Sequence, residues 1–182
     1  MRLDPIVIGP YDLSWPDSFS RQRDRIAPLL SGWTTRDIEH LGSTAVPGLH
    51  AKGIIDMLAV VGDIQAVLRA SEVLDPVGWV HAPEPFDESE RRFSFCFPDI
   101  SRRTHHLHVV EEASGDWRGW LAFRDYLRSH DDDALAYAAL KTQLANDCGQ
   151  DPNDRDAYRL GKATFIRTIT DRAVAEGLPR LN

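Results

Sequence analysis

The spacing of apolar residues divides the chain into an early helix, a series of strands and a late helical part. A helix is predicted to begin within residues 14–17, where Ser, Pro and Asp stand in positions favoured at helix starts, and to end at Gly32. Its apolar stripe consists of Phe19, Ile26 and Leu30.

Strands are expected over 36–41, 54–61, 78–81, 93–97 and 104–110. The second of these is apolar on both faces except at Asp56, a pattern typical of a strand covered on both sides. Asp63 is suited to cap a helix between the second and third strands, with the stripe Ile64, Val67, Leu68 and Leu74.

The last third of the chain reads as helical. One helix carries Trp117 to Leu127, a break follows at 131–133, and a second helix carries Leu135, Ala138 and Leu144. A final helix is expected from Asp151-Pro152-Asn153 to Gly177. The pattern predicts an α/β (α+β) fold, with a mixed β-sheet, packed helices and a C-terminal helical block in one domain, 1–182.

Composition and charge limit the classes of function. The 182 residues are 42% hydrophobic and 27% charged, as in ordinary globular proteins. The net charge of −7 argues against general nucleic-acid binding, although local arginines can still form a pocket for a small anion. Two distant cysteines, no signal-peptide pattern and no membrane-length apolar run lead us to expect a cytoplasmic protein.

Asp56 is the one charged residue in the apolar strand 54–61, so it is the first candidate for a chemical role. A buried carboxylate is costly unless it meets a cation or hydrogen-bond donors. The structural interpretation is that Asp56 caps a loop or pairs with Lys52 or a nearby arginine. The functional interpretation, which we adopt, is that Asp56 holds a metal ion and is catalytic.

The turn before this strand supports the functional interpretation. Gly42 and Ser43 leave the preceding strand in a turn whose backbone amides can face an anion. The hydroxyls of Ser43 and Thr44 add donors, and Lys52 adds positive charge. We therefore expect Gly42, Ser43, Thr44 and Lys52 to bind phosphate, the layout that phosphoryl or nucleotidyl transfer needs.

His106 and His108 supply a second set of candidate ligands. Residues two apart on a strand point to one face, so both imidazoles can join Asp56 if the two strands are neighbours. Two imidazoles and a carboxylate can hold a transition metal. The alternative is that His106 and His108 are surface or structural histidines that bind no metal.

Taken together, these segments resemble the GrpB family over nearly the whole chain. The resemblance rests on residues 39–49 and 51–56, Pro10-Tyr11-Asp12, Trp15-Pro16, His106-Leu107-His108-Val109-Val110, Phe123-Arg124-Asp125-Tyr126-Leu127-Arg128, Tyr137, Leu140-Lys141, Tyr158 and Gly161-Lys162.

The resemblance implies a nucleotidyltransferase-like fold, which some bacterial dephospho-CoA kinases carry as a similar C-terminal domain. In that superfamily a Gly-Ser turn precedes a strand with two acids spaced by one residue. Gly42, Ser43 and Asp56 match this pattern, whereas Leu58 occupies the second acidic position. This departure argues against two-metal catalysis.

The expected function is that of a nucleotidyltransferase-like protein, binding a nucleotide or phosphorylated small molecule with a divalent metal. Mg²⁺ is preferred, with Zn²⁺ or Mn²⁺ as alternatives. A catalytically degenerate module that binds a ligand or a protein is the first alternative, and a metal-dependent hydrolase with a His/Asp centre is the second. No membrane contact is expected, and a protein partner or a second copy stays open.

Overall fold

The computed structural model describes residues 6–63, 65, 69–84, 87, 89, 91–149 and 155–181. The helices in these residues are α1 (Trp15–Leu30), α3 (Ala70–Leu74), α4 (Asp116–Ser129), α5 (Asp131–Cys148), α6 (Arg155–Gly161) and α7 (Ala163–Ala175). The strands are β1 (Glu39–Leu41), β2 (Ile55–Val61), β3 (Val80–His81), β4 (Arg92–Phe97) and β5 (His105–Glu111).

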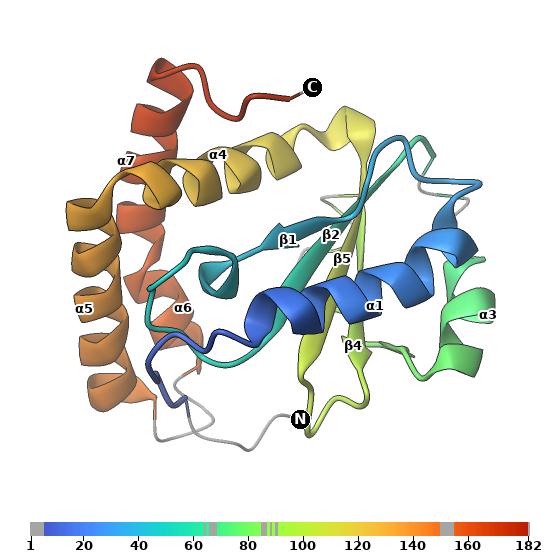
Figure 1. Cartoon of the computed structure of the whole chain (residues 1–182), viewed down its shortest axis with the longest axis horizontal. Coiled ribbons are helices and arrows are strands. Elements are labelled where there is room, and N and C mark those ends of the chain that lie inside the picture. Colours follow the sequence, from blue (N-terminus) through green and yellow to red (C-terminus); the bar gives the residue numbers. More distant parts are fainter. Residues whose placement is uncertain are drawn as a thin grey trace.

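The described strands form one mixed sheet in the order β1-β2-β5-β4-β3 (Figure 1). β2 and β5 run parallel, and the other neighbouring pairs are antiparallel. β2 lies between two neighbours, so the predicted interior position of strand 54–61 is confirmed, although β5 is the middle strand. The predicted α/β class, with helices packed on a mixed sheet, is also confirmed.

Alternation along β2 and β5 sends their side chains into two different cores. One core joins the sheet to α1, and its fully buried members include Ile26, Leu30, Met57 and Leu107. The other core joins the sheet to α4, and its members include Leu58, Val60, Trp117 and Leu121. In Figure 1, α1 and α4 accordingly lie on different sides of the sheet.

The helical block predicted for the last third is present, and its helices also pack on one another (Figure 1). The prediction of a single final helix was wrong, because the structure has two helices, α6 and α7, which are separated at Lys162. Gly161 packs closely against α5: a Cβ added there would lie 2.6 Å from Leu144 Cδ2. The predicted helix start at Asp151-Pro152-Asn153 lies outside the described residues.

Two other predicted elements differ in extent. Regular pairing in the first strand covers only three of residues 36–41, while the Thr35 amide still donates to the Val60 carbonyl at 2.9 Å. After Asp63, whose carboxylate accepts from the Gln65 amide, the described helix is α3. The predicted stripe positions Ile64, Val67 and Leu68 lie outside the described residues.

Two arginines of α4 hold β1 and the turn that follows it. Arg124 is 7% exposed; its Nη1 atom donates to the Glu39 carboxylate at 2.7 Å and to the His40 carbonyl at 2.9 Å. Arg128 Nε donates to the Ala45 carbonyl at 2.9 Å. Because these bonds reach across about eighty residues of sequence, α4 fixes the position of the segment that carries Gly42 and Ser43.

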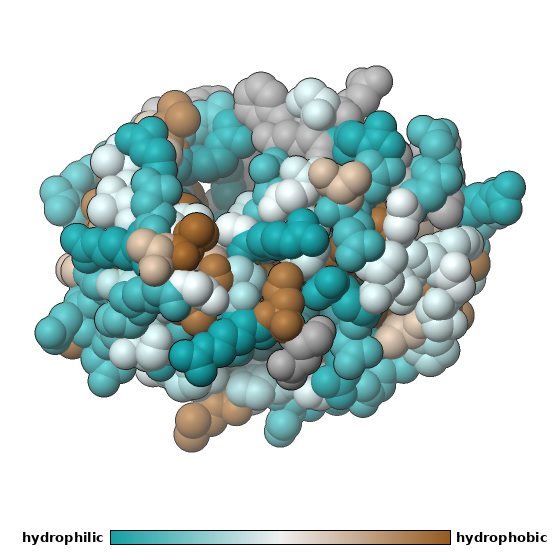
Figure 2. All heavy atoms as spheres, turned by 90° about the horizontal axis from the view of Figure 1, so that it is seen from above, coloured by the Kyte–Doolittle hydropathy of each residue, from teal (hydrophilic) through white to brown (hydrophobic). Residues whose placement is uncertain are grey.

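None of the described helices is both long and apolar enough to span a bilayer. Figure 2 shows that hydrophobic residues on the visible face form small, separate patches among hydrophilic ones. This pattern is ordinary for exposed protein surface.

Replacing Arg124 should destabilise the fold. Arg124→Ala removes the buried guanidinium and leaves its acceptors without that donor, so we expect a loss of about 2–3 kcal/mol in the free energy of unfolding. Thermal melting should fall by roughly 5–10 °C. Arg102→Ala is the matched control, because its side chain is 87% exposed. Equal melting temperatures for the two variants would contradict the role given to Arg124.

Candidate functional site

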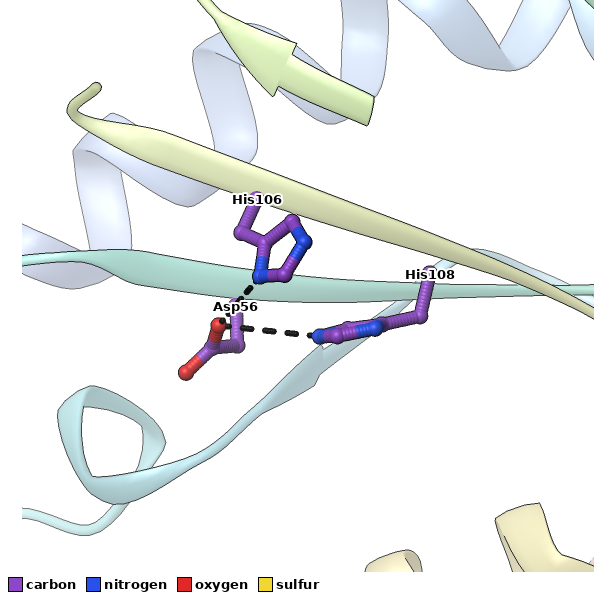
Figure 3. A group of neighbouring side chains, drawn as sticks. All are labelled: Asp56, His106 and His108. Carbon is purple, nitrogen blue, oxygen red and sulfur yellow. Dashed lines mark ion pairs between the residues drawn. The ribbon is translucent and has the colours of Figure 1, made fainter. Parts of the chain in front are cut away.

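Asp56 and two histidines meet on neighbouring parallel strands. Asp56 stands opposite His106 in the register of β2 and β5, and His108 lies two residues further along β5. Both imidazoles point toward the Asp56 carboxylate (Figure 3). Asp56 Oδ1 lies 3.6 Å from His106 Nδ1 and 3.7 Å from His108 Nε2. The strand pairing required by the predicted metal site is therefore present.

These separations suit a shared metal ion better than direct hydrogen bonds. An N–H···O hydrogen bond spans about 2.7–3.2 Å. Ligand atoms around a tetrahedral ion, with bonds of about 2.0–2.2 Å, lie roughly 3.3–3.6 Å apart. The ligand atoms of Asp56, His106 and His108 all lie within 4.8 Å of one another.

Glu84 lies on the other side of the His106 ring. Its Oε1 atom lies 3.7 Å from His106 Nε2, on the side of the ring opposite to Asp56. Arg103 Nη1 in turn lies 3.5 Å from Glu84 Oε1. The separation between Glu84 and His106 is longer than a hydrogen bond, so Glu84 contributes negative charge beside His106 and no direct hydrogen bond.

The electrostatics keep Asp56 and His106 in their ligating forms. Burial, together with the nearby His108, lowers the pKa of His106, so this imidazole is neutral at pH 7. Burial raises the pKa of Asp56, but its polar contacts with His106 and His108 outweigh that effect and hold the pKa well below its usual range. An ionised carboxylate beside a neutral imidazole is the state that binds a cation.

The second acidic position of the superfamily pattern is part of the core. Leu58 is fully buried and packs with Trp117 and Leu121 under α4. It shares a sheet face with Asp56 and stands opposite His108. A carboxylate at this position would be desolvated beneath α4, so His106 and His108 are the side chains that accompany Asp56 instead.

Position 42 must be glycine, because its backbone lies directly against the Asp56 carboxylate. Its φ of 69° and ψ of −169° lie in a region that only glycine adopts readily. A Cβ added at this position would lie 2.4 Å from Asp56 Oδ2. The turn can therefore press against the carboxylate only because residue 42 has no side chain.

The two hydroxyls of this turn have different surroundings. Thr44 is 1% exposed, and its hydroxyl bonds to His40 Nε2 at 3.0 Å and to the Ile54 carbonyl at 3.3 Å. Burial lowers the pKa of His40 to about 4, so the imidazole is neutral at pH 7. Because the Thr44 hydroxyl donates to the Ile54 carbonyl, it accepts from His40 Nε2–H. The Ser43 hydroxyl instead faces the cavity described next and accepts a bond from Lys141 Nζ at 2.8 Å.

A cavity of about 380 Å³ opens beside the triad. Of the predicted site residues, Ser43, Thr44, Lys52, Asp56 and His106 line it; Gly42 supports its wall, and His108 completes the triad from beside it. Among the described lining residues six are basic and three are acidic, so the cavity favours an anion. The basic ones are Lys52, Arg103, Lys141, Arg155, Arg159 and Lys162.

Sequence reasoning missed the wall of the cavity that α5 and α6 provide. Tyr137 and Lys141 come from α5, Tyr158 and Arg159 from α6, and Lys162 from the junction with α7. Lys162 Nζ lies 4.5 Å from the centre of the Tyr158 ring. The tyrosines and lysines were part of the family pattern, but no local spacing connected them with Ser43.

Comparison with known proteins shows which family the chain resembles. Residues 5–172 match the family model described as GrpB protein. The UPF0157 protein PA4798 of Pseudomonas aeruginosa is 38% identical over 173 residues, which cover 94% of this chain and 69% of that protein. The UPF0157 protein YqkA of Bacillus subtilis is 36% identical over 163 residues, 90% of this chain and 46% of that longer protein.

A solved structure agrees with the sequence comparison. The crystal structure of conserved protein GrpB from Enterococcus faecalis matches with a TM-score of 0.82 and 31% identity, covering 95% of this chain and 100% of the other. The family match, the relatives and the shared fold all point the same way, and the chain belongs to the GrpB family.

Proposed function

We propose that the protein binds a nucleotide or another phosphorylated small molecule together with a divalent metal ion, and that the site supports nucleotidyl or phosphoryl transfer. The observation that carries this proposal is the position of the Asp56, His106 and His108 triad at the edge of a basic cavity. A metal at the triad and an anion in the cavity would neutralise one another.

The turn at Gly42 and the basic side chains form the proposed phosphate subsite. Among the turn hydrogen bonds of the described residues, the Ala45 and Val46 amides have acceptors, whereas the Ser43 and Thr44 amides have none. Successive free amides of this kind bind phosphate oxygens. Lys52 adds charge from the cavity wall, and Thr44 contributes through its backbone because its hydroxyl is engaged.

Lys162 extends the subsite on the opposite wall. It forms no ion pair with any described residue, and burial lowers its pKa, with Asp56 acting in the other direction. An ammonium group that is desolvated without a carboxylate partner is stabilised by a bound anion. Lys162 is therefore assigned to a phosphate of the ligand.

The donor set favours a transition metal. Two imidazoles and one carboxylate suit Zn²⁺ or Mn²⁺, whereas Mg²⁺ prefers oxygen ligands. Asp56, His106 and His108 would hold the ion, and Glu84 would add negative charge beside His106. The bound metal supplies Lewis-acid stabilisation of the negative charge that develops during transfer.

A metal-dependent hydrolase is the second candidate. This candidate is favoured because Leu58, at the second acidic position of the superfamily pattern, is buried in the core. Asp56 is then the one acid that this strand supplies to the pattern. Water would then replace a second substrate as the acceptor. A phosphate ester incubated with the metal-loaded protein separates the two reactions, because only hydrolysis releases free phosphate without an added acceptor.

Metal binding should depend on the triad. Zn²⁺ or Mn²⁺ at about 100 times its Kd should stabilise the protein by roughly 3 kcal/mol, measured as a thermal shift. Asp56→Asn keeps the side-chain shape and removes the charge, so this shift should disappear, and His108→Ala should reduce it strongly. His81→Ala is the matched control, since His81 is exposed on β3.

Metal binding that survives Asp56→Asn would exclude the triad as the site. The absence of any response to metals or nucleotides would favour an interaction module without catalysis.

Phosphate binding should depend on Lys162. Lys162→Met retains much of the apolar stem and removes the charge, so we expect a loss of about tenfold or more in affinity for a nucleotide, measured by calorimetry at saturating Zn²⁺. Arg167→Met, a basic change on α7 outside the cavity, should leave the affinity unchanged. Equal losses in both variants would indicate only a general effect of net charge.

A further inference from the structure

Lys141 is a buried lysine whose partners are all uncharged or cationic. Its side chain lies on α5, and the residue is 3% exposed. Nζ donates to Ser43 Oγ at 2.8 Å and to the His50 carbonyl, and it lies 4.7 Å from the centre of the Tyr137 ring. None of these described partners is a carboxylate. Such a site disfavours the ammonium form of lysine.

The charges around Lys141 act in the same direction. Burial lowers its pKa to about 7, and the positive charge of Lys162 contributes. Burial raises the pKa of Tyr137, so this phenol stays neutral and supplies no counter-charge. At neutral pH a large share of Lys141 is therefore the free amine, with a lone pair within reach of Ser43.

Ser43 is placed to act as a nucleophile. It lines the cavity at the start of a short 3-10 turn (Ser43–Ala45), with its hydroxyl held by Lys141. The Ser43 and Thr44 amides lack acceptors among the described turn hydrogen bonds. Backbone amides beside a nucleophilic serine can stabilise an oxyanion.

We propose that Ser43 and Lys141 form a serine–lysine catalytic pair that cleaves esters of small anionic molecules by acyl transfer through Ser43. The pair has the arrangement of a nucleophile within hydrogen-bond reach of its base. The basic lining of the cavity selects the anionic substrate. The pair shares the cavity with the proposed metal-dependent function, but it does not use the metal.

The acyl-transfer step balances with the groups present. The Ser43 Oγ–H proton passes to the neutral Lys141 amine as Oγ forms a bond to the carbonyl carbon. The bond between this carbon and the alcohol oxygen then breaks, and the alcohol takes the proton from the Lys141 ammonium. Water subsequently attacks the acyl group, gives its proton to Lys141, and Ser43 recovers that proton as it leaves.

A small fluorophosphonate tests the pair directly. The Ser43 oxygen would displace fluoride and form a stable bond to phosphorus. Intact-mass measurement of the full chain, in chelator, should show one adduct, and peptide mapping should place it at Ser43. The labelling rate should rise with pH and level off above about 7, because the neutral amine is the active form.

Two substitutions separate a base from a simple positive charge. Lys141→Arg keeps the charge but cannot accept the proton at neutral pH, so labelling should slow at least 100-fold. Lys141→Met should slow labelling to a similar extent, with folding checked by thermal melting. Ser31→Ala, at an exposed serine that follows the last residue of α1, should label at the wild-type rate.

The outcomes distinguish this inference from the proposed metal function. Absence of an adduct at Ser43, or wild-type labelling of Lys141→Arg, would overturn the pair even if metal-dependent phosphate binding is found. Labelling that requires Lys141 in a protein without metal binding would support the pair and overturn the metal function.

Discussion

The parallel pairing of β2 with β5 is the constraint on which the site depends. This pairing sets Asp56 opposite His106 and places His108 on the same face. It also aligns the apolar residues of both strands in two cores, so a register shift would expose one core and separate the triad at once. Stability and site geometry are therefore fixed by the same hydrogen-bond ladder.

A second constraint positions the turn against this pair of strands. Gly42 approaches the Asp56 carboxylate too closely for any side chain, while Arg124 and Arg128 hold the turn from α4. Arginine is suited to this task because its several donors satisfy carbonyl and carboxylate groups together. The helical block thus contributes to the site at two levels, by fixing the turn and by lining the cavity.

Much of the strand half of the site was predictable, because alternation and an isolated carboxylate are local signals. Asp56 stood out within an apolar strand, and the spacing of His106 and His108 gave their shared face. The contribution of α5 was not predictable. Lys141 looks like one more polar residue on a helix, and only its packing against Ser43, 98 positions away in sequence, shows that it is buried.

The helical half also shows where local patterns fail for physical reasons. The Thr44 hydroxyl looked available for a ligand, but its bonds to His40 and Ile54 use it to hold the turn. The final helix looked continuous, but close packing of Gly161 on α5 accompanies a break that places Lys162 in the cavity wall. In both cases tertiary contacts decide the role of a residue whose local pattern is compatible with several.

The cavity concentrates features that a fold optimised for stability alone would avoid. A lysine desolvated without a carboxylate partner costs free energy in the unliganded protein, and Gly42 adopts a conformation that any other residue would take up only with strain. Residues that break local rules in this way gather at functional sites, where a ligand supplies the missing interactions. Both residues contact Ser43: Gly42 precedes it in sequence, and Lys141 donates a hydrogen bond to its hydroxyl. The physical argument for function is therefore strongest at this serine, between the basic wall and the metal triad.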